Sequence, residues 1–497
     1  MRNVGQADTD AIDVTLVPAT GDVGVSSRAL WPILLVAFAY LAKAISSDVS
    51  SLKRPFPLSP WESAITVDAW RVTQCQAIYT DPASGHATHM YGPLATYVAA
   101  PFVAAFGPDP RIPRTISFVA ASALCVLLGA VFLRLYGIVI ALLVTAVSFM
   151  QFFRVGQWEV DARPDAASLL FSALAMLAWY RANVALTDRD AIRWTLIGSL
   201  CMVLGIFFKQ QAIALAIVPF VVQLLPRDHP PRWRVALIPI AAAVLTVLCV
   251  RLISPWMFFY MFRVPASYSV AWPDWLIAIM EVMRVDALFV LALVGWAIVL
   301  QVRASRIETA DAFLLVTIVI AVLFGAALRA KLGGNFNSLL PATLAMTVFA
   351  ARVLPAIANR TPVFVAIIAP LLLLSDIVGV RRTFDPSMTA RHGDRQYDRV
   401  IARVKALPGT VVTPDDPTIA LRAKGYAGRS GECELDANGR VLTDHALNEI
   451  RWPDWVVQVR ASRAPTLSDE TLARFGFEKA TRGIPAGSVY VLWKRSN

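Results

Sequence analysis

Two short polar segments beside long apolar runs contain closely spaced carboxylates. The segment "PLSPWESAITVDAW" places Glu62 shortly after the first apolar run, and "RVGQWEVDARPDAAS" contains Asp161, Arg163 and Asp165 just before another. A carboxylate can act as general base towards a hydroxyl, and an arginine can hold an anionic leaving group. Ionisable groups at the edge of apolar runs are costly and tend to be functional. We therefore predict catalytic roles for Glu62, Asp161 and Asp165 and a substrate-binding role for Arg163.

Each of these carboxylates also has a purely structural explanation. Glu62 could be a solvated loop residue that caps the helix after it, since an acid in a first turn favours the helix dipole. The sequence "RPDA" is typical of a helix start, where Asp165 would offset the dipole and pair with Arg163. Asp161 could be structural in the same way. The residue pattern alone leaves both explanations open.

Two further polar turns provide cations and amides. "FFKQQAI" places Lys209 and Gln210 between two apolar runs, and "RAKLGGNFNSLLP" contains Arg329, Lys331 and Asn335. We predict that these residues bind substrate, with the backbone amides of the second turn as a further cradle for phosphate. Each turn also has a purely structural explanation. Lys209 could simply extend its ammonium to the membrane interface, and the second segment could be a tight turn in which glycine adopts a positive φ.

The loop after the first apolar run adds Arg54, His89 and Tyr91 to the predicted substrate-binding residues. His86 lies three residues before His89, but two histidines without a supporting motif do not predict a metal site, because such sites need more ligands. We therefore expect no metal site and no cofactor. Whether a divalent cation assists is left open.

These segments must be positioned by a membrane-embedded helical bundle. Of the 497 residues, 57% are hydrophobic and 16% are charged, with a mean hydropathy of +0.57, which is typical of a polytopic membrane protein. The apolar runs do not alternate with polar residues, which favours helices over a barrel. The net charge is +11, but no basic stretch is interleaved with aromatic residues. Membrane lipids are therefore expected partners and nucleic acid is not.

We predict an all-α bundle of about eleven transmembrane helices plus interfacial helices, followed by a small α/β domain. Cytoplasmic loops are enriched in arginine, which places the N-terminus in the cytoplasm if the short run 91–107 lies flat on the outer surface of the inner membrane. The first outer loop is then 48–112. The predicted parts are a cytoplasmic tail at 1–28, a transmembrane domain at 29–382 and an extracytoplasmic domain at 383–497. The spanning runs fall near 29–47, 113–135, 137–153, 165–182, 193–208, 210–226, 234–253, 276–301, 309–329, 336–354 and 361–380.

The C-terminal segment differs in character from the rest of the chain. "TVVTP", "WVVQVR" and "SVYVLWK" have the composition of strands, whereas "DRQYDRVIARVKAL" and "SDETLARFGF" have helical spacing. Together they predict an α/β fold. Five cysteines are too few for a disulfide framework, and a bridge between Cys75 and Cys433 is left open.

The order of these motifs resembles a known family. The segments "PLSPWESAITVDAWRVTQCQAIYTDP", "YGPLATYVAAPFVAAFG", "RIPRTISF" and "ARPDAASLLFSALA" are similar to those of GT-C membrane glycosyltransferases related to protein O-mannosyltransferases and aminoarabinose transferases. The resemblance covers roughly residues 30–350. It implies a polyisoprenyl-phosphate sugar donor, a glycan, lipid or protein acceptor, an outward-facing site, and a catalytic acid in the first outer loop. Glu62 occupies that place.

The sequence also departs from the family pattern. The family often has paired acids around the catalytic position, whereas this chain has Ser59 and Trp61 there, and Tyr91 stands where the aminoarabinose branch has lysine. The phosphate contact is then expected from Lys209, Lys331 or Arg329. Two other functions are alternatives, a transporter or flippase of a lipid-linked saccharide and a non-catalytic subunit of envelope assembly. Charges clustered at the edges of the bundle argue against a transporter, which needs them at the midplane.

Overall fold

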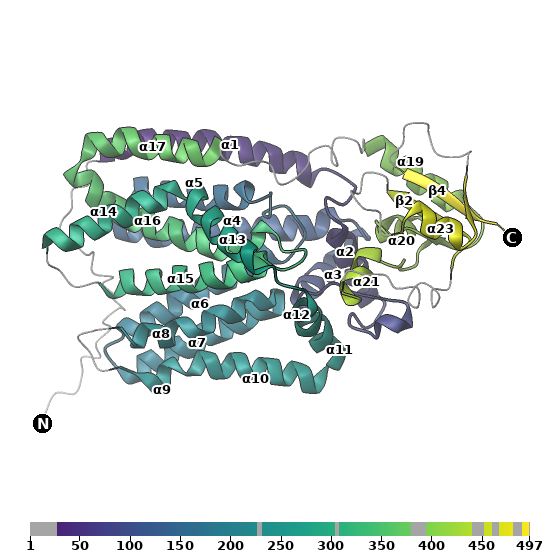
Figure 1. The fold of residues 1–497 in the computed structure, drawn as a ribbon, viewed down its shortest axis with the longest axis horizontal. Helices are drawn as coiled ribbons and strands as arrows, with labels where there is room; N and C mark the ends of the chain where they lie inside the picture. Colours follow the sequence, from purple (N-terminus) through teal and green to yellow (C-terminus); the bar gives the residue numbers. More distant parts are fainter. Residues whose placement is uncertain are drawn as a thin grey trace, which may run out of the picture.

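The structure is a computed structural model that describes residues 27–225, 231–303, 308–378, 394–439, 452–459, 467–480 and 490–496. An elongated bundle of helices carries a smaller α/β unit at one end, and the C-terminus lies in that unit (Figure 1). We refer to this end of the bundle as the α/β end. All but the last two residues of the predicted tail 1–28 lie outside the described residues.

Within the described residues, six helical stretches are long and apolar enough to cross a membrane, fewer than the eleven or so predicted. They are Arg28–Leu52, Arg111–Tyr136, Asp188–Phe208, Trp233–Ile253, Thr309–Arg329 and Phe336–Arg360. The helices of the bundle are η1 (Ser27–Leu30), α1 (Trp31–Leu52), α4 (Arg111–Tyr136), α5 (Ile138–Arg154), α6 (Asp165–Val184), α7 (Asp188–Phe208), η3 (Gln210–Ile217), α8 (Val218–Gln223), α9 (Trp233–Ala236), α10 (Ile238–Ile253), α14 (Ala287–Arg303), α15 (Thr309–Arg329), η5 (Phe336–Leu339), α16 (Leu340–Arg360) and α17 (Pro362–Val378).

The connections at the α/β end contain helices of their own. The 48–112 segment forms α2 (Pro60–Thr73), η2 (Pro82–Ser84) and α3 (Leu94–Phe106), and the connection after α10 forms α11 (Pro255–Phe258), the π-helical turn η4 (Phe259–Arg263), α12 (Val264–Ser267) and α13 (Trp272–Val285). Helix α3 has 13 residues and is therefore about 20 Å long, too short for a hydrocarbon core of about 30 Å. Its length agrees with the interfacial helix predicted at 91–107.

Several predicted runs take a different form from a single α-helix, and two of them matter for the site. The run 276–301 is divided at Asp286, which separates α13 from α14 and is buried against Arg154. The run 210–226 begins as the 3₁₀ helix η3 before it becomes α8. A 3₁₀ helix rises about 2.0 Å per residue against 1.5 Å for an α-helix, so this short run reaches further than its length suggests.

Helix α16 is the most buried of the six long apolar stretches. In the stretch Phe336–Arg360, 72% of an 18-residue apolar window is buried inside the protein. The corresponding share in the other five stretches is 28–44%. Small residues such as Ala342, Ala350 and Ala358 are buried on α16 and allow its neighbours to approach closely. Met346 and Phe349 fill the space between them in the main core. Helix α16 therefore fixes the relative positions of α5, α14 and α15, which pack on it.

The predicted α/β character of the C-terminal segment is confirmed. A four-stranded sheet has the order β1 (Val411–Val412), β2 (Trp455–Val459), β4 (Tyr490–Arg495) and β3 (Phe477–Lys479). Strands β1 and β2 are parallel, whereas β4 is antiparallel to both β2 and β3. The helices are α19 (Asp394–Ala406), α20 (Pro417–Lys424), α21 (Gly431–Ala437) and α23 (Asp469–Arg474). Cys75 and Cys433 are both free thiols, so they form no bridge.

The α/β unit packs on α2 through hydrogen bonds between buried polar groups. Ser63 donates to Asp416 at 2.9 Å, and Asp436 accepts from the Trp61 indole at 3.2 Å and from the Tyr268 hydroxyl at 2.7 Å. An unpaired buried polar group costs free energy, so these contacts specify one docked position. The unit therefore covers the segment that contains Glu62.

We expect Asp436→Ala to loosen this docking by about 1–3 kcal/mol, because it removes the carboxylate that accepts from the Trp61 indole and the Tyr268 hydroxyl. Hydrogen exchange of α2 and α21 in the purified full chain should rise. The control is Asp469→Ala, which removes an exposed carboxylate paired with Lys479 on the same unit. Equal exchange in the two variants would contradict the docking role of Asp436.

Candidate active site

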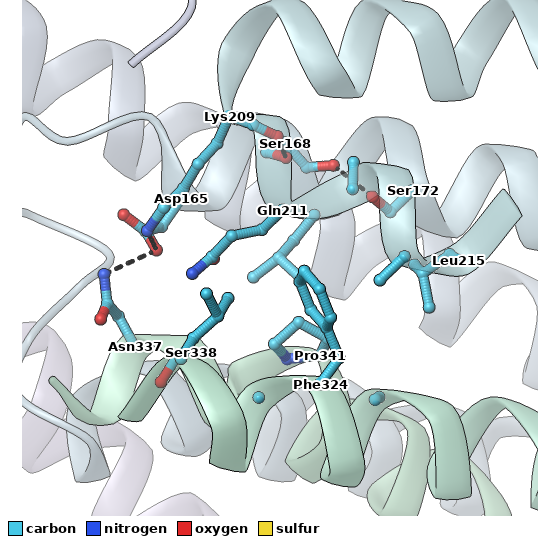
Figure 2. A pocket seen from close by; sticks show the side chains of 16 residues that line it. Asp165, Ser168, Ser172, Lys209, Gln211, Leu215, Phe324, Asn337, Ser338 and Pro341 are labelled. Atoms are coloured by element: carbon cyan, nitrogen blue, oxygen red, sulfur yellow. Dashed lines mark hydrogen bonds and ion pairs between the residues drawn. The ribbon is translucent and has the colours of Figure 1, made fainter. Parts of the chain in front are cut away.

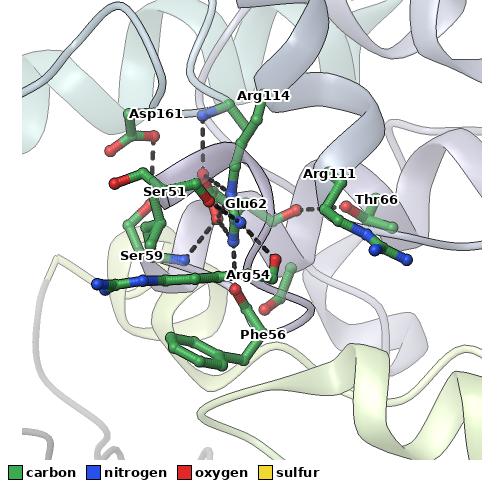
Figure 3. Close-up of polar contacts among 12 residues, drawn as sticks. Ser51, Arg54, Phe56, Ser59, Glu62, Thr66, Arg111, Arg114 and Asp161 are labelled. Atoms are coloured by element: carbon green, nitrogen blue, oxygen red, sulfur yellow. Dashed lines mark hydrogen bonds and ion pairs between the residues drawn. The ribbon is translucent and has the colours of Figure 1, made fainter. Parts of the chain in front are cut away.

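Glu62 lies in the first turn of α2 and is completely buried (Figure 3). Its carboxylate accepts hydrogen bonds from Arg114 Nε at 2.9 Å and Nη2 at 2.7 Å. It also accepts the backbone N–H groups of Leu58 at 2.5 Å and Ala162 at 3.1 Å. Burial raises the pKa of Glu62, and the Arg114 guanidinium opposes that shift. Both oxygens are therefore occupied by protein donors.

Arg114 uses all of its donors in this cluster. Besides Glu62, its guanidinium donates to the carbonyls of Ser51 at 3.0 Å, Arg54 at 2.7 Å and Phe56. An arginine has five N–H donors in a fixed fork, so this set is complete. The ion pair of Glu62 and Arg114 therefore joins the end of α1, the start of α2 and the start of α4 to the segment before α6. The Arg54 backbone, rather than its side chain, takes part.

Asp161 and Arg163 form a second ion pair close to the first. The Arg163 guanidinium donates to Asp161 at 2.8 Å and 3.1 Å, and the Ser59 hydroxyl donates to the same carboxylate at 3.3 Å. The guanidinium also lies 3.6 Å from the ring centroid of Trp158 and 4.8 Å from that of Trp61. Such stacking holds a guanidinium plane in one orientation. Asp161 is buried and directs Arg163.

Asp165, Lys209 and Asn337 form the third cluster (Figure 2). Lys209 Nζ donates to Asp165 Oδ1 at 2.6 Å, and Asn337 Nδ2 donates to the same oxygen at 3.0 Å. The other oxygen, Oδ2, is buried and accepts no hydrogen bond from the described residues. Burial lowers the pKa of Lys209, and the Asp165 carboxylate opposes that shift. Asp165 therefore keeps one oxygen available.

A small cavity of about 30 Å³ lies against this third cluster. Asp165, Lys209 and Asn337 line its polar part together with Gln211, whose amide points towards the gap between Lys209 and Asn337 in Figure 2. Helix α6 begins at Asp165, α7 ends just before Lys209, and Asn337 lies in the short helix η5. The side chains meet because three helix ends lie at the same level of the bundle.

The 48–112 segment is attached to the Lys209 turn by its backbone. The Gly92 N–H donates to the Phe208 carbonyl at 3.2 Å, and Gln210 donates to the Met90 carbonyl at 3.1 Å. A Cβ at Gly92 would lie 2.1 Å from the Phe207 carbonyl oxygen, so the approach requires glycine there. Tyr91 is buried with its ring centroid 5.6 Å from Lys209 Nζ. The contact thus places Tyr91 beside Lys209, although Tyr91 itself does not line the cavity.

Other residues of the predicted set have local partners instead. Arg329 donates to the Gly334 carbonyl at 3.1 Å, Lys331 donates to the Pro265 carbonyl at 2.9 Å, and the Asn335 side chain accepts from the backbone of Phe336 at 2.7 Å. None of Arg329, Lys331 and Asn335 lines the cavity. From these two turns, Asn337 and Gln211 reach the cavity, and the prediction had selected their neighbours Asn335 and Gln210.

A fourth polar network holds the loop between α2 and α3. Asp68 accepts from His86 at 2.8 Å and from Thr88, and His89 lies 3.7 Å away with its other contact to Thr96 at 3.0 Å. Burial alone would raise the pKa of Asp68, but the charge and hydrogen bonds of these neighbours lower it below its usual 3.8. No cluster of three or more potential metal ligands occurs in the part of the chain that the structure describes. His89 acts here as a partner within the loop.

Solved structures share this fold. No protein-family model and no curated protein sequence matches the chain. The aminoarabinose transferase ArnT from Cupriavidus metallidurans, crystallised with undecaprenyl phosphate, is 13% identical with a TM-score of 0.56, covering 92% of this chain and 97% of ArnT. The apo form of the same protein is 14% identical with a TM-score of 0.54 and the same coverage. An oligosaccharyltransferase from Archaeoglobus fulgidus is 12% identical with a TM-score of 0.49. The match covers 86% of this chain and 67% of the oligosaccharyltransferase. The predicted GT-C fold is confirmed.

We expect Arg114→Leu to lower the free energy of unfolding by about 3–5 kcal/mol, because it leaves the Glu62 carboxylate buried without a cation. The midpoint of thermal unfolding of the purified chain measures this loss. Arg111→Leu is the matched control, since Arg111 lies one turn earlier on α4 and its pair with Asp109 is largely exposed. That control should cost at most about 1 kcal/mol. Equal shifts in the two variants would rule out a structural role for the pair.

Acid should loosen the loop between α2 and α3 through Asp68. Because the pKa of Asp68 in the folded protein lies below 3.8, its stabilisation is complete above about pH 4 and is lost as the pH falls through the folded pKa. We expect hydrogen exchange of residues 74–92 to rise in that acid range in the wild type. Asp68→Asn should already exchange faster at neutral pH and respond less to acid. Asp81→Asn, in the same loop, should behave like the wild type, and an acid response in Asp68→Asn equal to that of the wild type would contradict this origin.

Proposed function

We propose that this chain is a membrane glycosyltransferase that transfers a sugar from a polyisoprenyl-phosphate donor to an acceptor hydroxyl at the outer face of the cytoplasmic membrane. The observation that supports it best is the cavity beside Asp165, Lys209 and Asn337, which combines a cation, amide donors and an available carboxylate oxygen. The GT-C fold and the undecaprenyl phosphate bound by ArnT agree with this chemistry.

The donor phosphate would bind at Lys209, with Gln211 and Asn337 as further donors. Lys209 now pairs with Asp165, so an incoming phosphate would compete with Asp165 for the ammonium. Charge-assisted hydrogen bonds to phosphate are among the strong ones, and they would hold the charge that develops on the leaving group. Lys331 and Arg329, the other predicted phosphate ligands, lie outside the cavity in this structure.

The lipid tail of the donor would continue into a second, apolar cavity. A larger cavity of about 520 Å³ extends between α4, α6, α15 and α16. It shares four lining residues with the small cavity: Leu169, Ser172, Leu215 and Pro341. A polyisoprenyl chain is uncharged hydrocarbon and gains free energy by leaving water for such a space. One path thus offers a phosphate site at the α/β end and an apolar channel behind it.

Asp165 is our candidate for the general base. It would take the proton of the acceptor hydroxyl while the hydroxyl oxygen attacks the anomeric carbon of the sugar. The bond from that carbon to the phosphate oxygen breaks, and polyisoprenyl phosphate leaves with its charge held by Lys209. Glu62, predicted as the base from the sequence, accepts only protein donors here, which favours a positioning role for it. Asp161 would serve by directing Arg163.

The topology proposed with this function keeps about eleven spans, a cytoplasmic N-terminus and an extracytoplasmic α/β unit. The α/β end contains the cavity and would face outwards, and α3 would lie in the outer interface. At the opposite end, Arg134 and Arg181 lie in the last turns of α4 and α6, and Arg232 lies just before α9, as expected for the cytoplasmic side. With this orientation the α/β unit, which covers α2, is available to select the acceptor.

We expect Asp165→Asn to lower turnover by about 10²–10⁴-fold, the usual effect of losing a general base. Purified protein is mixed with a panel of polyisoprenyl-phosphate sugars and an envelope extract as acceptor, and donor consumption is measured. The fold should persist, because an amide can still accept from Lys209 and Asn337. Lys209→Gln should weaken donor binding as well as turnover.

Two controls make this experiment decisive. Asp274→Asn removes an exposed carboxylate on α13 and should leave turnover unchanged. Glu62→Gln distinguishes the two candidate bases, since a positioning role predicts a lowered unfolding midpoint together with any loss of turnover. Undiminished turnover in Asp165→Asn would exclude it as the base, and no consumption of any donor by the wild type would exclude the proposed activity.

A further inference from the structure

The apolar cavity ends in a cationic mouth at the end of the bundle away from the α/β unit. Arg134 at the end of α4, Arg181 near the end of α6 and Arg352 on α16 line it there, beside Tyr136 and Trp194. The rest of the wall is almost entirely apolar, with residues such as Leu128, Leu174, Leu177 and Val348. Three guanidinium groups therefore stand at the entrance of a hydrocarbon-like space.

The three arginines differ in their partners. Arg352 donates to Asp311 at 2.6 Å, to Glu308 at 2.5 Å and to the Tyr136 hydroxyl at 2.9 Å, so two carboxylates face its one positive charge. Arg181 lies 4.8 Å from the Trp194 ring centroid and Arg134 is exposed. Neither Arg134 nor Arg181 forms an ion pair or hydrogen bond with any residue that the structure describes. Arg134 and Arg181 thus have no counter-charge among the described residues, and the three arginines with Glu308 and Asp311 give the mouth a net charge of +1.

We propose that this mouth binds the phosphate of an anionic phospholipid, with the acyl chains inside the apolar cavity. Guanidinium groups match phosphate oxygens in shape and charge, and basic pockets between transmembrane helices bind anionic lipid headgroups. The apolar wall supplies the matching environment for acyl chains. Headgroup and chain contacts therefore point to the same class of ligand.

The donor proposed above does not account for this mouth. Asp165 and Arg181 lie 16 positions apart on α6, which is about 24 Å along the helix. One phosphate cannot contact both ends of such a path, and a polyisoprenyl tail has no charge that the arginines could pair with. The inference requires only the cavity and the two arginines Arg134 and Arg181, and a donor tail that entered the same cavity would compete with the phospholipid for it.

The test measures lipid retained by the purified full chain. Native mass spectrometry with equimolar phosphatidylglycerol and phosphatidylethanolamine should show preferential binding of phosphatidylglycerol. A basic residue near an anionic lipid contributes about 1 kcal/mol, so Arg134→Gln with Arg181→Gln should reduce that preference about thirtyfold. Ala345→Trp, which fills part of the cavity while keeping both arginines, should lower binding of the same lipid.

The control is the double variant Arg189→Gln and Arg234→Gln. It removes the same charge from exposed positions at the same end of the bundle that do not line the cavity, and should keep the preference. Equal loss in both double variants would show only general attraction to anionic lipid and would overturn the site. Equal binding of the two lipids by the wild type, or displacement of phosphatidylglycerol by polyisoprenyl phosphate through the arginine mouth, would overturn it as well.

Discussion

The buried pair of Arg114 and Glu62 is the interaction on which the rest of the candidate site depends. A buried charge without a partner is so costly that both side chains must meet, and the guanidinium then distributes its remaining donors over the carbonyls that follow α1. The carboxylate in turn accepts the backbone of Ala162, one residue from Asp161 and three from Asp165. A single ion pair therefore sets where the segment before α6 lies, and with it the direction from which Asp165 enters the cavity.

A second constraint comes from ending helices inside the bundle. Backbone groups at a helix end need partners, and polar side chains are tolerated there because the local structure is already polar. Helix α7 stops before Lys209, α6 starts at Asp165, and η5 precedes α16, all at one level. The attachment at Gly92 adds the 48–112 segment to the same level. Reactive side chains from four distant parts of the chain are thus gathered where the helical ladders are interrupted.

Hydropathy was sufficient to predict the helical bundle, and residue composition and spacing were sufficient to predict the α/β character of the C-terminal segment, because both features depend on local pattern. The acids and cations that line the cavity were also identifiable by their cost beside apolar runs, as Asp165 and Lys209 illustrate. The pairing of Glu62 with Arg114 was not, since the two residues are 52 positions apart and an arginine in "RIPRTISF" has no local sign of its partner. That Asn337 rather than Asn335 lines the cavity depends on the geometry of η5. The break between α13 and α14 at Asp286 depends on the ion pair with Arg154 from another helix. Tertiary contacts decide these features.

The two ends of the apolar path differ in how their charges are balanced. In the first three clusters at the α/β end each carboxylate has a cation: Glu62 has Arg114, Asp161 has Arg163 and Asp165 has Lys209. Such a site is neutral when empty, so an anion can bind only by taking a cation from a carboxylate. When the donor phosphate takes Lys209 from Asp165, that exchange would release the proposed base at the moment the donor arrives. At the other end Arg134 and Arg181 have no described counter-charge, so an anion there displaces nothing and binds at no such cost. The first arrangement suits a substrate whose arrival must trigger chemistry, and the second suits a lipid that stays bound.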